Sequence, residues 1–251
     1  MRILYLGNNW LGWKVLEWLQ AQGEEIVGLV IHPENRRKYG DELLASVTPG
    51  QTQIFTATEL RKADTLQAIQ ALKPDVALSI LFGFILQPSF LSLFPRGVIN
   101  LHPAYLPYNR GANPNIWSIV ENTPAGVTLH YIDPGIDTGD IIAQEQVVVE
   151  PVDTGLTLYN KLEMASLALF QRTWPLIRSG QVPRLPQAGE GTFHRVQDVV
   201  QLDEINLDQE YIARDLINVL RARTFPPYGG AYFLHEGRKV FLKLELEYED
   251  R

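Results

Sequence analysis

The sequence contains no cysteine among its 251 residues. This absence excludes a disulfide framework, a zinc site with cysteine ligands and a thiol nucleophile. Basic residues are also few, since 22 Lys and Arg stand against 29 Asp and Glu for a net charge of −7. They form no cluster of the kind that neutralises a phosphate backbone. We therefore expect no nucleic acid partner.

Long apolar runs are missing as well. The opening segment MRILYLGNNW is too short to be the core of a signal peptide. No later run approaches the roughly 20 apolar residues that a membrane-spanning helix needs. Together with the lack of cysteine, this predicts a cytoplasmic protein that makes no contact with a membrane.

Apolar strands alternate with amphipathic helices in the first part of the chain. A strand over 2–6 precedes a Gly-bearing turn, a helix over 13–23 and a second strand over 25–32. This order is typical of a βαβ unit, whose strands are parallel. Further apolar strands over 75–83 and 97–102 predict an α/β fold: a Rossmann-like, mainly parallel sheet with helices on both faces.

The rest of the chain adds a hairpin, a long helix and a smaller extension. The Pro- and Gly-rich stretch SGQVPRLPQAGEGTFHR indicates a surface connection. We therefore predict a catalytic domain over 1–185 and an extension over 186–251. The other expected elements are a loop with a short helix over 33–50, helices over 60–73, 114–122, 156–178 and 210–224, strands over 126–132 and 141–149, and a hairpin over 229–249.

Two polar side chains stand at the end of a buried strand. Asn100 and His102 are two residues apart, so they project from the same face of the sheet. Ligands of open parallel sheets bind beyond the carboxyl ends of the strands, where this pair lies. Pro103 and Pro107 then restrict the backbone of the following loop. We expect one site to use both side chains.

A second polar group lies in the loop DPGIDTGD, which is bounded by glycines that permit a tight fold. Its carboxylates can reach the imidazole of His102. We expect Asp133 and Asp140 to cap turns, as Asp does in Gly-rich loops. His130, just before the loop, is expected to pack against the hairpin.

An amide, an imidazole and a carboxylate together suit the attack of an amine on a carbonyl. A carboxylate beside an imidazole orients the ring and favours its protonated form. A neutral amide or an imidazolium stabilises the negative charge that gathers on the carbonyl oxygen. The departing proton of the amine needs only a general base, and no covalent nucleophile is required.

The motifs INLHPAYLPYNRG and GVTLHYIDPGIDTGDII, in this order, resemble the formyltransferases that use N10-formyltetrahydrofolate. The general pattern covers roughly residues 1–180. The resemblance implies a catalytic triad of Asn100, His102 and Asp137 and no metal. It also implies lipopolysaccharide O-antigen biosynthesis as the setting of the reaction. The folate pocket that it implies is formed by Phe84, Ile85, Leu86, Ile132, Asp133 and Gly135.

The acceptor is inferred from the tail and the loop after the histidine. Residues 209–251 carry seven Lys and Arg against seven Asp and Glu. Within the family that the chain resembles, methionyl-tRNA formyltransferases carry a basic C-terminal barrel instead. A neutral tail gives no drive toward RNA. The motif YNRGANPNIWS resembles the sugar N-formyltransferases, which implies a nucleotide-linked amino-deoxysugar as acceptor. Glycinamide ribonucleotide, methionyl-tRNA or water remain alternative acceptors.

Several polar and aromatic side chains are candidates for contact with the acceptor. Arg110 can pair with a phosphate through both ends of its guanidinium group. Tyr105 or Trp10 can stack on a base or sugar ring. The turn GNNW at residues 7–10 offers free amides at a strand-to-helix connection. The full set of candidates is Asn8, Trp10, Tyr105, Asn109, Arg110 and Asn113.

Other functions stay open at this point. A metal-dependent hydrolase could use His102, His130, Asp133 and Asp137, although no ligand spacing typical of zinc is present. A formyltetrahydrofolate hydrolase would share the triad. A folate or nucleotide sensor would use the same fold without turnover. The alternating hairpin near the C-terminus is a candidate edge for a homodimer.

Overall fold

The structure is a computed structural model that describes residues 1–249. Its described residues form two compact units, each built from several segments. Unit 1 contains residues 1–102, 128–144 and 166–187, and unit 2 contains residues 103–127, 145–165 and the described residues from 188 onward. The predicted domains 1–185 and 186–251 stay a prediction, and the last two residues of the extension, 250 and 251, lie outside the described part.

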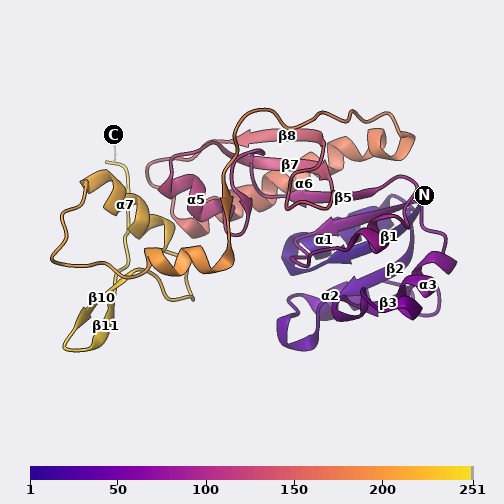
Figure 1. Cartoon of the computed structure of the whole chain (residues 1–251), viewed down its shortest axis with the longest axis horizontal. Coiled ribbons are helices and arrows are strands. Elements are labelled where there is room, and N and C mark those ends of the chain that lie inside the picture. Colours follow the sequence, from indigo (N-terminus) through magenta and orange to yellow (C-terminus); the bar gives the residue numbers. More distant parts are fainter. Residues whose placement is uncertain (250–251) are drawn as a thin grey trace. The chain divides into compact units, whose positions relative to one another are not determined.

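A seven-stranded sheet is the main feature of the fold (Figure 1). Its strand order is β3-β2-β1-β4-β5-β7-β8. The first five strands are parallel, and β7 runs antiparallel to β5. This confirms the predicted α/β fold with its mainly parallel sheet. The strands are β1 Arg2–Gly7, β2 Glu25–Ile31, β3 Gln53–Thr56, β4 Val76–Ile80, β5 Val98–His102, β7 Ala125–Tyr131 and β8 Ile141–Val147.

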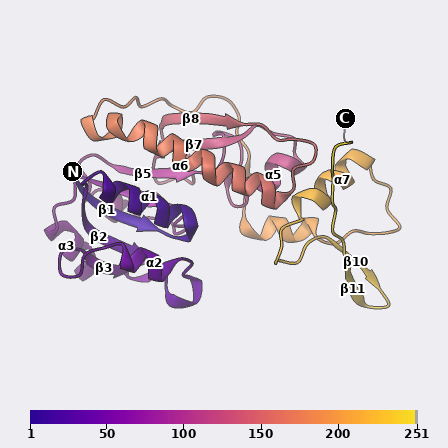
Figure 2. The same ribbon diagram turned by 180° about the vertical axis from the view of Figure 1, so that it is seen from behind.

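Helices connect the strands of the sheet. The first of them, α1, buries Leu11, Val15 and Leu19 on one side, the spacing of an amphipathic helix. It lies along β1 (Figure 2). The helices are α1 Asn9–Ala21, α2 Gly40–Ala45, α3 Ala63–Ala71, α4 Pro88–Leu91, α5 Pro114–Val120, α6 Gly155–Ser179 and α7 Ala213–Ala222, with 3-10 turns η1 Glu34–Arg36, η2 Ala57–Glu59 and η3 Val196–Leu202.

The central strands are buried throughout. Every residue of β4 is buried, and so is every residue of β1 after Arg2. Continuous apolar strands of this kind belong inside a sheet that is covered on both faces. We therefore expect a ligand to bind at the ends of the strands rather than on a face of the sheet. Strand β5 ends there with His102.

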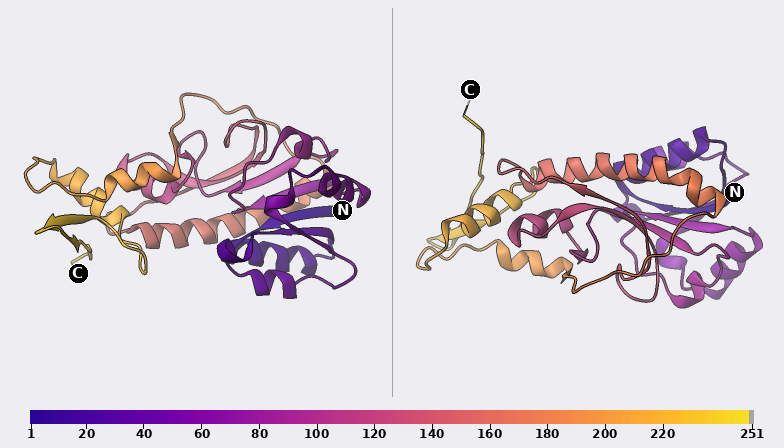
Figure 3. Two further views of the ribbon diagram at one scale, coloured as in Figure 1. Left: turned by 60° about the horizontal axis from the view of Figure 1, so that its bottom comes forward. Right: turned by 90° about the horizontal axis from the view of Figure 1, so that it is seen from above.

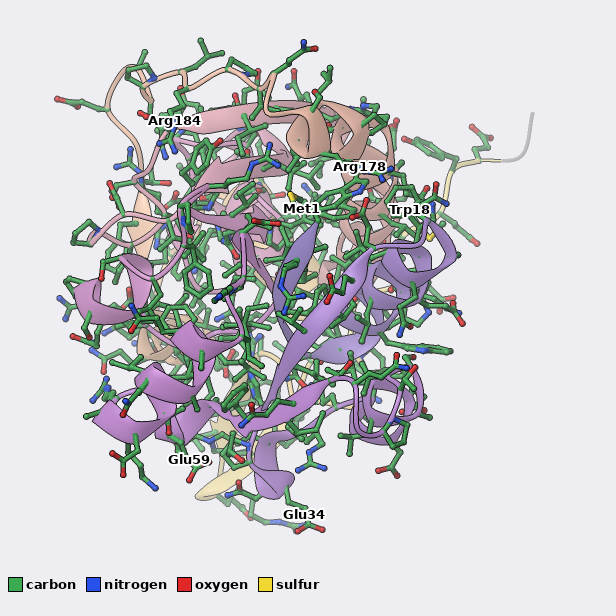
Figure 4. The ribbon with its side chains drawn as sticks, turned by 90° about the vertical axis from the view of Figure 1, so that its right-hand side faces the viewer. Met1, Trp18, Glu34, Glu59, Arg178 and Arg184 are labelled. Carbon is green, nitrogen blue, oxygen red and sulfur yellow. The ribbon has the colours of Figure 1, made fainter. Side chains whose placement is uncertain are left out.

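The buried carboxylate of Glu24, just before β2, connects the amino-terminal end of the chain to α6. Glu24 accepts hydrogen bonds from the Trp174 indole at 3.0 Å and from the amino group of Met1 at 3.0 Å. Arg178 lies 3.2 Å from the same side chain, and Figure 4 labels Met1 and Arg178 near each other. Because these partners compensate the buried charge, the amino-terminal strand is fixed against the helix.

Unit 2 has less regular structure. A parallel pair joins β6 Arg110–Gly111 to β9 Phe193–His194, and an antiparallel pair joins β10 Tyr232–His235 to β11 Arg238–Phe241. Helix α5 contacts α7. The β10–β11 hairpin follows α7 at the C-terminal end of the chain (Figure 3).

Several features differ from the sequence-based expectations, and helix α1 begins at Asn9 where a helix over 13–23 was expected. Strand β3, helix α4 and the 3-10 turn η3 were not predicted, because their apolar patterns are too short to show a period. The C-terminal hairpin was predicted over 229–249, yet β11 ends at Phe241. The alternating residues after it satisfy a strand pattern without having a strand beside them.

Among the described residues, no helix combines the length and apolarity needed to cross a membrane.

Candidate active site

The end of β5 presents Asn100 and His102 on one face of the sheet. Asn100 is opposite His130 of β7 in the antiparallel register, and His102 is opposite Thr128. Directly opposed residues of an antiparallel pair project to the same face. The pairing of β5 with β7 therefore brings His130 to the same place as the two residues that the sequence singled out.

The loop after β7 supplies the carboxylate. Asp137 has a left-handed backbone, with φ of 53°, a conformation that Asp tolerates better than most residues. A Cβ on Gly139 would lie 1.9 Å from the Tyr131 carbonyl oxygen, and one on Gly135 would lie 2.0 Å from the Thr138 hydroxyl. Only glycine fits at either position. The two glycines therefore permit the tight turn that the sequence predicted.

A glutamine from a distant segment fixes the tip of this loop. The amide of Gln187 donates to the carbonyl oxygens of Asp137 at 2.8 Å and Gly139 at 2.9 Å. Sequence reasoning had placed Gln187 in a surface connection. Its role depends on a pairing across the fold, which no local pattern reveals.

The three expected triad side chains lie together. His102 Nε2 is 3.7 Å from Asp137 Oδ2, within ion-pair range but longer than a hydrogen bond. Asn100 Nδ2 is 3.5 Å from Asp137 Oδ1. The Asp137 side chain is 16% exposed and that of His102 is 7% exposed. The carboxylate is thus turned inward, toward the amide and the imidazole.

His130 is a fourth member of this cluster. Its Nδ1 lies 2.8 Å from the carbonyl oxygen of Tyr131, which only accepts, so Nδ1 carries a hydrogen. Its Nε2 lies 3.1 Å from Asn100 Nδ2 and 3.5 Å from Asp137 Oδ1. In the neutral ring, Nε2 accepts one amide hydrogen of Asn100. The second amide hydrogen points along the longer, weaker contact to Asp137.

Packing against the hairpin was the sequence-based expectation for His130. The side chain is indeed 1% exposed, but its ring contacts two triad residues as well. The available signal was the position of His130 at the end of a strand, next to the carboxylate loop. Its importance became visible only with the β5–β7 register.

Several residues expected to contact folate belong to one apolar cluster of unit 1. Leu86 is a buried member of this cluster together with Phe82 and Phe90, and Phe84 and Ile132 pack against it. Ile132 also donates its backbone N–H to the Val98 carbonyl oxygen at 2.8 Å. Phe84, Leu86 and Ile132 thus share one apolar cluster, and their contact with folate stays a prediction.

The remaining expected folate residues are placed differently. Ile85 is 65% exposed. Asp133 accepts bonds from the Gly135 N–H at 3.0 Å and the Thr138 hydroxyl at 2.6 Å. These are the turn-capping bonds that the sequence indicated for an aspartate here. Asp133 and Gly135 therefore shape the loop through their own internal contacts.

The turn after β1 contains Asn8 and Trp10. Asn8 is 6% exposed, and its Oδ1 accepts the backbone N–H of Lys38 at 2.9 Å. Its Nδ2 faces His32 Nδ1 at 3.3 Å. Trp10 is half-buried in the first turn of α1. The side chain of Asn8 is thus directed inward, which leaves Trp10 as the more accessible member of the pair.

In unit 2, the loop that carries the other acceptor candidates is bonded to β9. Two backbone groups of this loop bind Thr192, the residue before β9. The Asn109 N–H donates to the Thr192 hydroxyl at 2.8 Å, and the Arg110 N–H donates to the Thr192 carbonyl oxygen at 3.0 Å. A Cβ on Gly111, whose φ is 88°, would lie 2.3 Å from the His194 carbonyl oxygen. Close approach at this glycine lets the two segments pair.

The individual acceptor candidates of this loop differ in accessibility. Asn109 is fully buried, and its amide donates to the hydroxyls of Ser118 and Thr123, each at 2.9 Å. Tyr105, Arg110 and Asn113 are half-buried. Asn113 begins α5 in a left-handed conformation. The bonds of Asn109 stabilise the loop, so its side chain is committed to the interior of unit 2.

Metal ligands are not gathered anywhere in residues 1–249: no group of three or more His, Cys, Asp or Glu in this range has the geometry to hold an ion. The cluster around Asp137 contains one carboxylate and two imidazoles. Each imidazole faces an oxygen of this carboxylate, so the three groups do not converge on a point where an ion could be bound. Its donor set suits proton transfer and charge stabilisation.

Two family models match the chain. The model described as formyl transferase matches residues 14–173, and the model described as N-formyltransferase dimerization C-terminal domain matches residues 198–248. The first covers more than half of the sequence and includes the whole cluster. The second matches the region of η3, α7 and the C-terminal hairpin.

Known proteins resemble the chain over almost its full length. A 4-N formyltransferase from Francisella tularensis is 28% identical, with a TM-score of 0.84 over 99% of this chain and 98% of that one. The formyltransferase PseJ from Anoxybacillus kamchatkensis, solved with UDP-4,6-dideoxy-4-formamido-L-AltNAc and tetrahydrofolate, is 31% identical, with a TM-score of 0.59 over 80% of this chain and 89% of that one.

A methionyl-tRNA formyltransferase from Pelotomaculum thermopropionicum is 27% identical over 99% of this chain and 80% of its own length. The relatives thus share formyl transfer and differ in acceptor. With the formyl transferase model matched across most of unit 1 and the expected triad in contact, the chain belongs to the formyl transferase family and is an enzyme that transfers formyl groups.

Proposed function

We propose that the enzyme moves a formyl group from N10-formyltetrahydrofolate to the amino group of a nucleotide-linked amino-deoxysugar. The likeness to the Francisella tularensis 4-N formyltransferase carries this proposal, because it spans 99% of one chain and 98% of the other. The C-terminal part is included in this match, and it is the part that lacks the basic character expected of methionyl-tRNA formyltransferases.

The donor suits the site on unit 1. Phe84, Leu86 and Ile132 offer an apolar wall for a pterin ring, and backbone groups of the loop around Asp133 lie beside it. The Anoxybacillus kamchatkensis relative was solved with tetrahydrofolate. When bound here, the folate supplies an activated formyl group to the end of β5.

The cluster at the end of β5 performs the transfer. Asn100 donates the amide hydrogen that His130 does not hold to the formyl oxygen, on which negative charge gathers, in place of its longer contact with Asp137. The protonated His102, favoured by Asp137, stabilises the same charge. A bond forms from the acceptor nitrogen to the formyl carbon, and the bond from that carbon to N10 breaks. His102 gives its proton to N10 as this bond breaks and then takes the proton that the amine nitrogen loses, so the charge of the His102–Asp137 pair is restored.

His130 is a positioning residue in this scheme. Its Nε2 holds one hydrogen of the Asn100 amide, so only the other, which lies along the longer contact to Asp137, is used for the reacting oxygen. Gln187 holds the backbone of Asp137 from the opposite end of the loop. Both contacts reduce the reorganisation needed at the moment of transfer.

Arg110, Tyr105, Asn113 and Trp10 are the proposed acceptor contacts. Arg110 is suited to the diphosphate of a sugar nucleotide, and the two aromatic side chains to its base or sugar. Asn8 and Asn109 contribute by fixing the segments that carry these residues, since both side chains are buried. A homodimer formed through the C-terminal hairpin completes the proposal.

Methionyl-tRNA is the second candidate acceptor, because relatives that match 99% of the chain carry that name. The net charge of −7 and the equal number of acidic and basic residues over 209–251 oppose it, since tRNA binding depends on a basic surface. The nucleotide sugar is therefore the favoured acceptor.

A panel of acceptors tests the proposal. Nucleotide-linked 3-amino and 4-amino deoxysugars, glycinamide ribonucleotide and charged initiator tRNA are each incubated with enzyme and N10-formyltetrahydrofolate. Mass spectrometry then detects the added formyl group, and the Asp137→Asn enzyme is the control. We expect product with one sugar nucleotide only. Faster formylation of the tRNA would reject the sugar assignment, and folate turnover without any acceptor would indicate a hydrolase.

A further inference from the structure

His32 at the end of β2 connects three segments of unit 1. It is 8% exposed, and it follows directly on the last residue of the strand. Its ring reaches Asn8 in the turn after β1 and the carbonyl oxygen of Phe82 in the segment after β4. The triad chemistry does not use this buried, polar side chain, so its presence requires another explanation.

The hydrogen-bond pattern determines the state of the ring. The Lys38 N–H donates to Asn8 Oδ1 at 2.9 Å, so the amide nitrogen of Asn8 faces His32. An amide nitrogen only donates, so Nδ1 of His32 accepts and carries no hydrogen. The hydrogen is therefore on Nε2, which donates it to the Phe82 carbonyl. His32 is neutral and has one defined tautomer.

The Phe82 carbonyl belongs to a stretch that has no helix or strand of its own. Residues 81–87 follow β4 without regular structure, and Leu81 and Gly83 have positive φ values of 49° and 66°. Residues 81–87 therefore lack the regular backbone hydrogen bonds that fix a strand. The hydrogen bond from His32 to the Phe82 carbonyl oxygen fixes this segment instead.

Ring contacts add to this bond. His32 meets Phe82 edge-on at 5.2 Å between centroids and Phe84 edge-on at 5.0 Å. Phe82 and Phe84 are themselves 5.3 Å apart. The imidazole thus stands against both aromatic rings that begin the apolar wall, so its position sets the orientation of Phe84 as well as the course of the backbone.

We propose that His32 is a positioning residue for the formyl donor: it fixes the segment of Phe82 to Leu86 that forms the pterin wall, and through Asn8 it ties that wall to the turn after β1. This inference rests on the proposed use of a folate donor but not on the identity of the acceptor. It gives a function to a side chain outside the triad and to the buried orientation of Asn8.

The test separates the hydrogen bonds of His32 from its shape. His32→Phe keeps a ring for the edge-on contacts and removes both hydrogen bonds, whereas His32→Gln keeps an amide hydrogen for the Phe82 carbonyl. Equilibrium binding of tetrahydrofolate is measured by calorimetry, and KM for N10-formyltetrahydrofolate and kcat are measured with the active acceptor. His235→Phe, an exposed substitution on β10, is the matched control.

For His32→Phe, we expect folate binding to weaken about tenfold and the donor KM to rise by the same factor, as loss of a buried hydrogen bond predicts. The kcat at saturating donor should change by less than about threefold. His32→Gln should recover part of the affinity, and His235→Phe should match the wild type.

A folded His32→Phe enzyme whose folate affinity equals that of the wild type would overturn the inference. So would a loss of kcat with unchanged donor KM. If His32→Phe does not fold, the same comparison is made with His32→Gln, for which a folate affinity weakened by up to about tenfold at unchanged kcat supports the inference and wild-type affinity refutes it. Wild-type enzyme that binds no folate would instead refute the proposed function itself, so the two failures are distinguishable.

Discussion

His102 and His130 stand almost perpendicular to each other, with ring centroids 6.3 Å apart and planes at 88°, and they approach different oxygens of one carboxylate. His102 faces Oδ2 of Asp137 and His130 faces Oδ1. One carboxylate can therefore orient the proton-transferring ring of His102 while lying beside the ring that holds the Asn100 amide. This arrangement makes Asp137 the centre of the cluster.

Replacing that carboxylate should remove most of the activity. Asp137→Asn keeps the size of the side chain but removes the charge that favours protonated His102, so we expect kcat to fall by about 10²- to 10⁴-fold. Formation of the formylated product measures the loss, and circular dichroism checks the fold. Asp140→Asn in the same loop is the control. Equal activity of the two variants would contradict the role of Asp137.

His130 should affect kcat rather than substrate affinity. His130→Phe preserves a buried ring but cannot accept the Asn100 hydrogen, so the amide loses its fixed orientation. We expect kcat to fall about tenfold to a hundredfold, because small misplacements of a reacting group have effects of that size. Steady-state kinetics with both substrates separate kcat from KM. A variant with normal kcat and raised KM would show that His130 serves binding instead.

The sequence predicted the sheet because its strands depend on local patterns, whereas the choice of Asp137 as the third triad residue came from the family resemblance. Continuous apolar runs mark β1, β4 and β5, and the polar residues at the end of β5 stand out against them. The roles of His130 and Gln187 could not be predicted in this way. Each depends on a register or a contact between segments more than 25 residues apart, about 30 for His130 with Asn100 and 50 for Gln187 with Asp137.

The sequence-based acceptor set illustrates the same limit. Asn8 and Asn109 are polar residues in loops, which made them candidates for ligand contact. In the structure, both amides are buried and bonded to the protein itself. Asn satisfies loop backbones as readily as it binds ligands, and only burial distinguishes the two uses.

Asn109 should therefore matter for stability. Asn109→Ala leaves the hydroxyls of Ser118 and Thr123 without the amide donor, so we expect the free energy of unfolding to fall by about 1–3 kcal/mol. Urea denaturation followed by tryptophan fluorescence measures this change. The acceptor KM should stay within about threefold of the wild type at a temperature where the variant is folded. A large rise in acceptor KM without loss of stability would restore Asn109 to the binding set.

His32 should make stability depend on pH. Burial lowers the pKa of His32 from its ordinary 6.5, with the positive charge of Arg36 acting in the same direction and bonds to the Phe82 and Arg36 backbones opposing it. Below pH 6.5, His32 is protonated in the unfolded chain but stays neutral in the folded chain, so the unfolded state is stabilised relative to the folded state. The contribution is therefore fully present above pH 6.5 and is lost as the pH falls toward the lowered pKa.

Urea denaturation at a series of pH values from 7.5 downward checks this expectation. The free energy of unfolding of the wild type should decrease more steeply than that of His32→Gln, since the other histidines are common to both proteins. The charged groups near the ring, Arg36 and Arg37, keep their charge throughout this range and add no titration of their own. Parallel curves for the two proteins would contradict a lowered pKa.

The C-terminal hairpin offers a test of the proposed dimer. In the β10–β11 register, Tyr232 is opposite Phe241 and Leu234 is opposite Lys239, so these four side chains share one face. Leu234 is 48% exposed and Phe241 is 52% exposed, which leaves apolar surface on that face. The family model matched over 198–248 describes a dimerization domain. We expect a second copy of the chain to cover this face.

Leu234→Glu should separate the dimer, because a contact over this face would bury the new carboxylate together with Lys239 opposite it, and the desolvation of such a pair can exceed its attraction. Sedimentation velocity measures the change from dimer to monomer. The neighbouring His235→Glu, which adds the same charge on the other face of the hairpin, should leave the dimer intact. If both variants dissociate alike, charge alone is responsible; if neither does, the interface lies elsewhere on the chain. A selective effect of Leu234→Glu is what an interface built on this one face requires, since successive strand residues point to opposite sides.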